Sequence, residues 1–210
     1  MLSSAELFNV FSNLFALPAI GAALYFKLWD SAALLATLAS ASFIYHACQT
    51  DFFCIFVRHV QGAQDYFLLQ VADQVLVYVA ITWFTFYALQ IPGRVNVAVA
   101  FISSLIFYLT YISGTEETDA IVYSVIGAFI LGGLVYTLVK RTKLRFGYVT
   151  TSLLVGVGAI AVLFFFLDER DDDDDDRYNA FHGVWHMLAF LALLFLILIK
   201  YEKKYFILKP

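Results

Sequence analysis

Two histidines four residues apart, His182 and His186, are the side chains best suited to chemistry in this sequence. They stand at the head of the last long apolar run, shortly after six consecutive aspartates. In a helix, residues at this spacing lie one above the other on the same face. Neutral imidazole is a common zinc ligand, so the pair indicates part of a metal site. The alternative is a pair of interfacial histidines that hydrogen-bond to water and lipid headgroups.

A third imidazole and a carboxylate occur in two other apolar runs. Ser42 and His46 are also four residues apart and share a helical face near the end of the second run. By themselves they could be a buried hydroxyl and a satisfied core histidine. Asp73 lies about two turns inside the third run, where a carboxylate is costly unless it meets a cation, a metal-bound water or a hydrogen-bonding cluster. Asp65, at the boundary of that run, is interpreted as solvated.

The elements that must position these residues are membrane-spanning helices. The chain has 210 residues, of which 62% are hydrophobic and only 14% are charged, and such a composition predicts an integral membrane protein. Each apolar run approaches the ~20 residues needed to cross a bilayer. We therefore expect an all-α protein, a single seven-transmembrane helix bundle over residues 1–210. The expected helices cover about 6–26, 31–50, 66–90, 95–113, 120–139, 147–167 and 180–199.

Basic residues predict the orientation of this bundle. With the N-terminus outside and the C-terminus cytoplasmic, ten basic residues fall on the inner side and three on the outer side, which satisfies the positive-inside rule. The inner set is Lys27, Arg94, Lys140, Arg141, Lys143, Arg145, Lys200, Lys203, Lys204 and Lys209, and the outer set is Arg58, Arg170 and Arg177. No basic patch interleaved with aromatic residues occurs outside the membrane rims, so we expect no nucleic-acid partner.

In this topology the four candidate groups converge at one depth, near the outer boundary of the bilayer. Three imidazoles (His46, His182 and His186) plus a water would complete a tetrahedral zinc site with one open position, which is typical of catalytic zinc. Asp73 could hold and deprotonate that water, and Ser42 could hydrogen-bond an oxyanion or Asp73 itself.

Three further features of the sequence concern its outer side and its packing. Cys48 and Cys54 are the only cysteines, and a short-loop disulfide or two buried free thiols are both open. The run Asp171–Asp176 is expected to stay extended and hydrated as a spacer, with weak cation binding as the alternative. Asn9 and Asn13 are expected to bond to a neighbouring helix, and the glycines at 127, 132 and 133 suit close helix packing.

The arrangement of these residues resembles a known superfamily. A Ser-x-x-x-His motif on the second helix, an aspartate on the third and His-x-x-x-His on the seventh are similar to the CREST membrane hydrolases, which include alkaline ceramidases, adiponectin-type receptors and GPI-lipid remodelling enzymes. The segments Tyr45–Cys48, Val122–Gly127 and Phe164–Phe166 resemble the myomaker branch of that superfamily, and the resemblance spans nearly the whole chain.

This resemblance implies two functions of different classes. The favoured expectation is a multi-pass plasma-membrane protein that promotes cell–cell fusion of myoblasts at the hemifusion step, with zinc held by His46, His182 and His186. The alternative is a zinc-dependent lipid hydrolase of ceramidase or phospholipase type that acts on outer-leaflet lipid. Expected partners are membrane lipids, a second copy in a homo-oligomer, and a second fusogen.

Overall fold

The computed structural model describes residues 3–49, 65–113, 118–140, 148–168 and 175–199, and within these ranges the regular structure is helical. The helices are α1 (Ser4–Ser12), the 3-10 helix η1 (Asn13–Phe15), α2 (Ala16–Tyr25), α3 (Trp29–Gln49), α4 (Asp65–Ala88), α5 (Gly93–Ser113), α6 (Thr118–Val139), α7 (Tyr148–Asp168) and α8 (Asp175–Leu198). Because α1, η1 and α2 form one continuous span, the described chain has seven helices long and apolar enough to cross a membrane. The expected fold class is confirmed.

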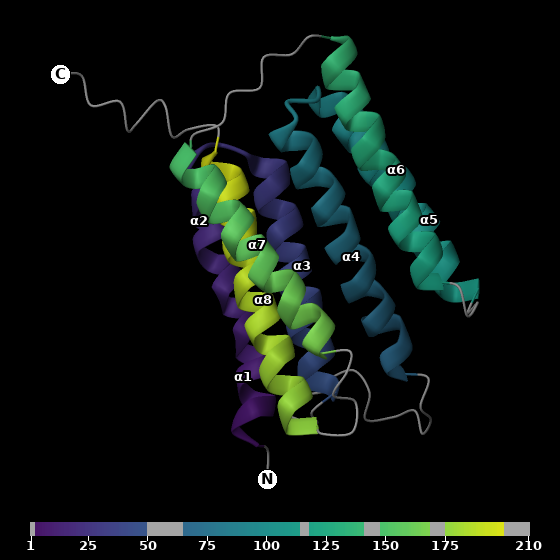
Figure 1. Ribbon diagram of the computed structural model, residues 1–210. Coiled ribbons are helices and arrows are strands. Elements are labelled where there is room, and N and C mark those ends of the chain that lie inside the picture. The colour runs from purple at the N-terminus through teal and green to yellow at the C-terminus, as the bar shows by residue number, and fades with distance from the viewer. Residues whose placement is uncertain (1–2, 50–64, 114–117, 141–147, 169–174, 200–210) are drawn as a thin grey trace, which may run out of the picture.

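The spans run alternately up and down, so the ends of distant segments meet (Figure 1). The start of α1, the end of α3, the start of α4 and the start of α8 all lie at the lower end of the bundle in this view. The turn between α2 and α3, the start of α5 and the end of α6 lie at the upper end. The candidate residues of α4 and α8 therefore lie at the same end of the bundle as those of α3.

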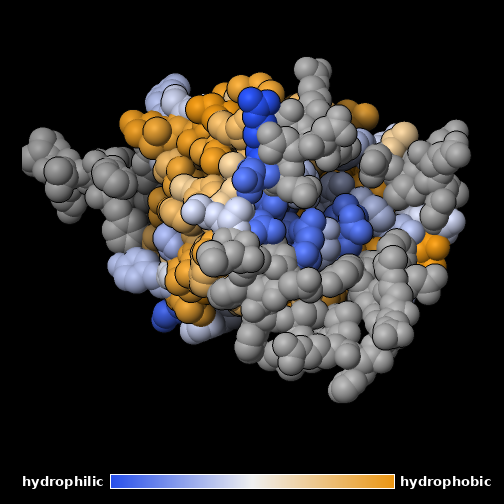
Figure 2. Space-filling view, turned by 90° about the horizontal axis from the view of Figure 1, so that it is seen from below, coloured by the Kyte–Doolittle hydropathy of each residue, from blue (hydrophilic) through white to orange (hydrophobic). Residues whose placement is uncertain are grey.

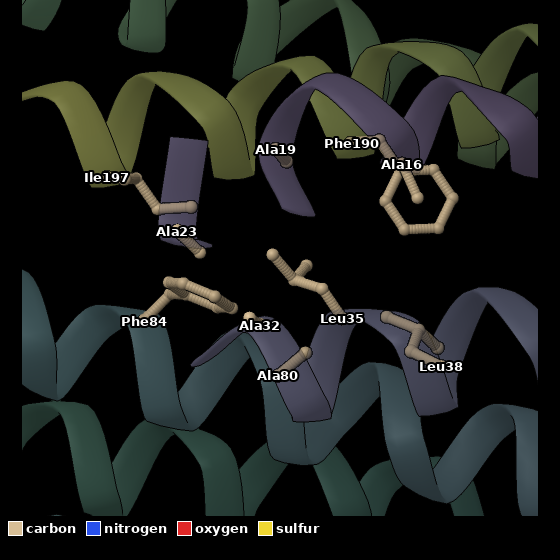
Figure 3. Close-up of a cluster of buried hydrophobic side chains, with 10 residues drawn as sticks. All are labelled: Ala16, Ala19, Ala23, Ala32, Leu35, Leu38, Ala80, Phe84, Phe190 and Ile197. Carbon is tan, nitrogen blue, oxygen red and sulfur yellow. The ribbon is translucent and has the colours of Figure 1, made fainter. Parts of the chain in front are cut away.

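The main hydrophobic core lies where α2, α3, α4 and α8 meet (Figure 3). Small side chains of α2 let this helix approach α3 and α8 closely, and Leu35, Phe84 and Ile197 are fully buried in the space between them. Close backbone approach through small residues is the usual way in which membrane helices pack, because lipid is as apolar as the side chains. The buried residues of this core are Ala16, Ala19, Ala23, Ala32, Leu35, Leu38, Ala80, Phe84, Phe190 and Ile197.

The first span changes its helical geometry halfway, at η1. Pro18 has no backbone N–H with which to bond the carbonyl group of Leu14, and the chain tightens into a 3-10 turn just before it. The Ser12 hydroxyl adds to this break, because it donates to the carbonyl oxygen of Asn9 at 2.6 Å within the last turn of α1. This break separates the polar part of the span, α1, from the alanine-rich part, α2.

Two short turns at the upper end are closed by the same capping motif. Lys27 and Gln90 adopt positive φ values of 59° and 58° just after α2 and α4. The amide N–H of the following residue, Leu28 or Ile91, then donates back to the last turn of the helix, at 2.8 and 3.0 Å. This Schellman pattern ends a helix abruptly. The chain therefore turns back at once, so that α3 runs back along α2 and α5 runs back along α4.

Several expectations about helix ends and packing need correction. Helix α8 begins at Asp175, five residues earlier than expected, because acidic side chains are stabilising at a helix N-terminus. The last two aspartates of the run are therefore helical rather than extended, whereas 171–174 lie outside the described residues. Asn9 bonds to another helix as expected, but Asn13 donates to the carbonyl oxygen of Val10 in its own span.

The glycines of α6 also differ from one another in their packing. Gly133 is closely packed, since an added Cβ would lie 3.0 to 3.1 Å from side chains of α4 and the α4–α5 turn. Gly127 and Gly132 would meet nothing within 4 Å. Close packing within the chain therefore accounts for one of the three glycines.

Candidate metal centre

Three histidines from two helices meet at the lower end of the bundle. His46 lies in the last turn of α3, and His182 and His186 lie on successive turns of α8. One ring nitrogen of each lies within 4.8 Å of the others. The ring centroids are 4.8 Å apart for His46 and His182, 5.0 Å for His46 and His186, and 4.5 Å for the two α8 histidines. The structure thus brings together the three imidazoles that the sequence singled out.

The buried face of α3 carries His46 into the protein interior. On α3, the buried residues Leu35, Leu38, Ser42 and His46 recur every three or four positions, so the stripe that packs into the core ends in the histidine. His46 is completely buried and His186 is 4% exposed, and ionisable side chains are rarely buried to this degree unless other groups satisfy them.

Aromatic residues hold the α8 rings on their outer side. Tyr178 stacks on His182 with ring centroids 5.3 Å apart and an angle of 24° between the planes. Trp185 lies against both α8 histidines and is packed in turn against Phe165 of α7 at 5.7 Å. Phe165 of α7 therefore supports the helix that carries two of the imidazoles.

Hydrogen bonds engage the Nδ1 atom of two of the histidines. His46 Nδ1 lies 2.9 Å from the side-chain oxygen of Gln49, and His186 Nδ1 lies 3.0 Å from the hydroxyl of Ser12. The Nε2 atom of His186 is buried and has no hydrogen-bond partner among the described residues. A buried ring nitrogen without a partner is costly unless a ligand satisfies it.

Asp73 and Ser42 stand beside the imidazoles. Asp73 of α4 is 5% exposed and interacts electrostatically with His182 and Tyr45. It also faces the hydroxyl of Ser42, but Ser42 Oγ and Asp73 Oδ1 make no hydrogen bond of good geometry with any described residue. A carboxylate buried in this way requires a cation or a water molecule close by.

These residues fit a transition-metal ion of the zinc type. Zinc takes imidazole nitrogens at ~2.0–2.1 Å in a tetrahedron, which places ligand nitrogens about 3.4 Å apart. The three nitrogens lie within 4.8 Å of one another, so side-chain rotations must bring them closer by up to about 1.4 Å for one ion to bind all three. Three neutral nitrogen ligands leave a fourth position open, and Asp73, whose Oδ1 is buried and has no hydrogen-bond partner among the described residues, interacts electrostatically with His182.

The centre lies beneath the polar end of the bundle. Figure 2 shows this lower end with hydrophilic residues gathered near its middle and hydrophobic residues towards the rim. Among the exposed polar residues here are Gln49, at the end of α3, and Asp176 and Arg177, at the start of α8. The cluster is therefore buried in protein but close to the water-facing end.

Some predicted residues lie outside the described part of the chain. Cys48 is fully buried and disulfide-bonded, but Cys54, its predicted partner, belongs to the segment 50–64 that is not described. The side chain of Asp65, which was expected to be solvated, is likewise not described. Arg58 and Arg170 of the outer basic set also fall outside.

Sequence reasoning missed Ser12 and Gln49, which bond to the imidazoles, and it did not identify the partners of Asn9. Ser12 lies 174 residues from His186 and Asn9 lies 37 residues from His46, so distance along the chain hides these contacts. Gln49 is an ordinary polar residue one turn after His46. The one available signal is that Asn9 and Ser12 are polar residues three apart in an apolar helix, a spacing that places both on one face.

Comparisons with known proteins identify the chain at the level of its family. No curated protein matches it by sequence. The family model described as "Protein of unknown function (DUF3522)" matches residues 3–187, a range that includes Ser42, Asp73 and the three histidines. Because the match covers most of its length, the chain belongs to the DUF3522 family.

Proposed function

We propose that this protein is an intramembrane zinc hydrolase that cleaves an ester or amide bond of a lipid in the outer leaflet. The observation that carries the proposal is the buried Asp73, which interacts electrostatically with His182 of the three-histidine cluster and faces the hydroxyl of Ser42. A purely structural metal site needs neither a buried carboxylate nor a hydroxyl next to it. Hydrolysis needs both a proton acceptor and a hydrogen-bond donor close to the reacting carbonyl group.

The residues divide into ligands and groups that handle protons. A zinc ion held by His46, His182 and His186 supplies Lewis acidity to a carbonyl group and to water. Asp73 takes a proton as the oxygen of water attacks the carbonyl carbon, and it returns this proton to the departing nitrogen or oxygen. Ser42 donates its hydroxyl hydrogen to the negative charge that develops on the carbonyl oxygen. The products are a fatty acid and an amine or alcohol.

The depth of the centre supports a lipid as the substrate. Asp73 lies eight residues into α4, which corresponds to about 12 Å along the helix axis. The ester and amide bonds of membrane lipids lie at a similar level, between the headgroups and the hydrocarbon chains. The long outward faces of α5, α6 and α7 are apolar, so the bundle that contains the centre is surrounded by lipid.

The charge distribution supports the assignment of the histidine end to the leaflet opposite the cytoplasm. The α2–α3 turn, the start of α5 and the end of α6 carry Lys27, Arg94 and Lys140, and all three segments lie at the end opposite the histidines. Because cytoplasmic loops are enriched in lysine and arginine, the histidine end faces the exterior.

A lipid-release assay on purified protein tests the hydrolase. Zinc-loaded protein in mixed micelles is given ceramide and glycerophospholipid substrates, and free fatty acid, sphingosine and lysolipid are measured by mass spectrometry. We expect release by the wild type and none by Asp73→Asn. Asp30→Asn is the matched control, because Asp30 is an exposed aspartate at the other end of α3. No release from any lipid class by zinc-loaded wild type would eliminate the hydrolase.

A second candidate function is cell–cell fusion of the myomaker type. It is supported by the resemblance of segments far from the histidines, such as Val122–Gly127, of which Val122 and Ile126 pack in the core shared by α4, α5 and α6. Because these residues serve packing, the resemblance to myomaker is not restricted to the metal ligands and extends over the whole bundle. Under this proposal the zinc stabilises the fold, and a second fusogen or a second copy of the chain completes the activity.

Expression in cells that do not normally fuse distinguishes the two functions. Mixing of membrane dye and mixing of cytoplasmic contents are scored separately, alone and with a partner fusogen. A fusion protein produces membrane mixing that persists in Asp73→Asn, because that residue serves hydrolysis alone. Membrane mixing lost in Asp73→Asn but kept in Asp30→Asn links fusion to hydrolysis, and no mixing in any combination removes the fusion function.

A further inference from the structure

Helix α1 reaches the candidate metal centre with a hydroxyl group. Ser12 is completely buried, and its Oγ lies 2.6 Å from the carbonyl oxygen of Asn9 and 3.0 Å from Nδ1 of His186. A carbonyl oxygen can only accept, so the single hydroxyl hydrogen of Ser12 points to Asn9. At His186 the hydroxyl oxygen must therefore accept, and Nδ1 of His186 must carry the hydrogen.

His46 is held in the same protonation pattern by its own helix. Its Nδ1 lies 2.9 Å from the side-chain oxygen of Gln49, which can only accept. Asn9 Nδ2 donates one of its two hydrogens to Asn179 at 2.9 Å and lies farther from Nδ1 of His46, at 3.4 Å, so the shorter contact with Gln49 determines the hydrogen on Nδ1. In both histidines the hydrogen on Nδ1 leaves the lone pair on Nε2, the nitrogen that is available to bind a metal.

The contact between Ser12 and His186 depends on an unusually close approach of α1 to α8. An added Cβ at Gly183 would lie 2.7 Å from the ring of Phe8 and 3.3 Å from Cα of Asn9. The absence of a side chain at this position, between the two histidines of α8, lets the helices touch. The hydrogen bond from Asn9 to Asn179 fixes the register of α1 one turn before Ser12.

We propose that Ser12 is a positioning residue that holds His186 in the Nδ1–H tautomer and aims its Nε2 at the metal. This inference rests on the proposed metal site and assigns α1 a role in it. Metal-bound histidines generally donate their second ring N–H to an acceptor, and loss of that acceptor typically weakens metal binding 10- to 100-fold. Here the acceptor is supplied across the bundle, 174 residues away in the sequence.

Four forms of the full chain in detergent test this role: wild type, Ser12→Ala, Ser12→Thr and Ser103→Ala. Ser103 is the matched control, because it is also completely buried and bonds to its own helix, α5, on another face of the bundle. Zinc affinity is measured by competition with a chelator. We expect a loss of about 10- to 100-fold in Ser12→Ala, near wild-type affinity in Ser12→Thr, and no change in Ser103→Ala.

Nitrogen NMR of metal-free protein with labelled histidine gives a readout that a merely structural serine would not change. His186, assigned from the spectrum of His186→Gln, should show the hydrogen on Nδ1 in wild type and Ser12→Thr, and a shift towards Nε2–H in Ser12→Ala. A hydrogen on Nε2 of His186 in the wild type overturns the inference, as does unchanged affinity and tautomer in Ser12→Ala. If Ser12→Ala does not fold, the wild-type tautomer decides.

The two proposals fail in different ways. If the wild type binds no zinc, the proposed function is wrong. The nitrogen NMR spectrum of metal-free protein still tests whether Ser12 sets the tautomer of His186. A wild type that binds zinc with equal affinity in Ser12→Ala, with the tautomer unchanged, defeats only the role of Ser12.

Discussion

Replacing Gly183 with alanine should loosen the metal centre without touching any ligand. The new Cβ would lie 2.7 Å from Cδ1 and Cε1 of Phe8, whereas carbon atoms in contact prefer ~3.5–4.0 Å. Cα of Asn9, at 3.3 Å, must give by a few tenths of an ångström, and helix α1 must retreat by about 0.8 Å where the Phe8 ring keeps its rotamer. A retreat of this size lengthens the 3.0 Å contact from Ser12 to His186 beyond the limit of a good hydrogen bond.

The energetic cost can be separated from the gain in helix propensity by a matched glycine. Overpacking of this kind costs about 1–3 kcal/mol, and alanine gains ~1 kcal/mol over glycine in a helix. Gly132→Ala gains the same propensity with no contact within 4 Å. The two variants should therefore differ in stability by about 1–3 kcal/mol, or on the order of 2–12 °C in thermal midpoint for a chain of this length.

Thermal unfolding and zinc competition on both glycine variants test this reasoning. Gly183→Ala should melt below Gly132→Ala and bind zinc about 10- to 100-fold more weakly than wild type. Gly132→Ala should bind zinc normally. If Gly183→Ala is as stable as Gly132→Ala and keeps wild-type zinc affinity, the close approach of α1 does not support the histidines.

Three other perturbations give direct outcomes. Asp73→Asn should retain bound zinc but lower turnover by about 10²- to 10⁴-fold, the usual worth of a general base; survival of turnover in a zinc-loaded variant excludes Asp73 as the base. Phe84→Ala should destabilise the bundle by about 3–5 kcal/mol, since its side chain is fully buried among α2, α3, α4 and α8, whereas Phe101→Ala, at 72% exposure, should cost far less; equal unfolding midpoints would contradict this core. Chelation should lower the melting temperature of wild type but not of His186→Ala, because zinc at 100 times its Kd stabilises the folded state by about 2.7 kcal/mol; equal shifts would point to metal bound elsewhere.

Much of the fold and part of the centre can be predicted from the sequence. Seven apolar runs are long enough to span a bilayer, and ionisable residues inside them are conspicuous because they are costly there. His46, His182, His186 and Asp73 stand out for this reason. The alternation of spans then places the end of α3 and the start of α8 on one side of the membrane, where the structure finds them together.

The supporting residues could not be predicted, because they depend on how helices cross. Ser12 meets His186 only because α1 approaches α8 at Gly183, and no local pattern encodes this contact. The early start of α8 at Asp175 was missed because like charges favour an extended chain, whereas the dipole of the helix favours acidic residues at its start.

Metal content of the purified protein tests the central claim most directly. Wild type expressed with ample zinc and analysed by elemental mass spectrometry should contain about one zinc per chain, as expected for one tetrahedral site. His46→Ala, His182→Ala and His186→Ala should each lose this zinc, and Ser103→Ala should keep it. The account would be contradicted by a wild-type protein that folds, keeps its melting temperature when a chelator is added, and contains no stoichiometric metal.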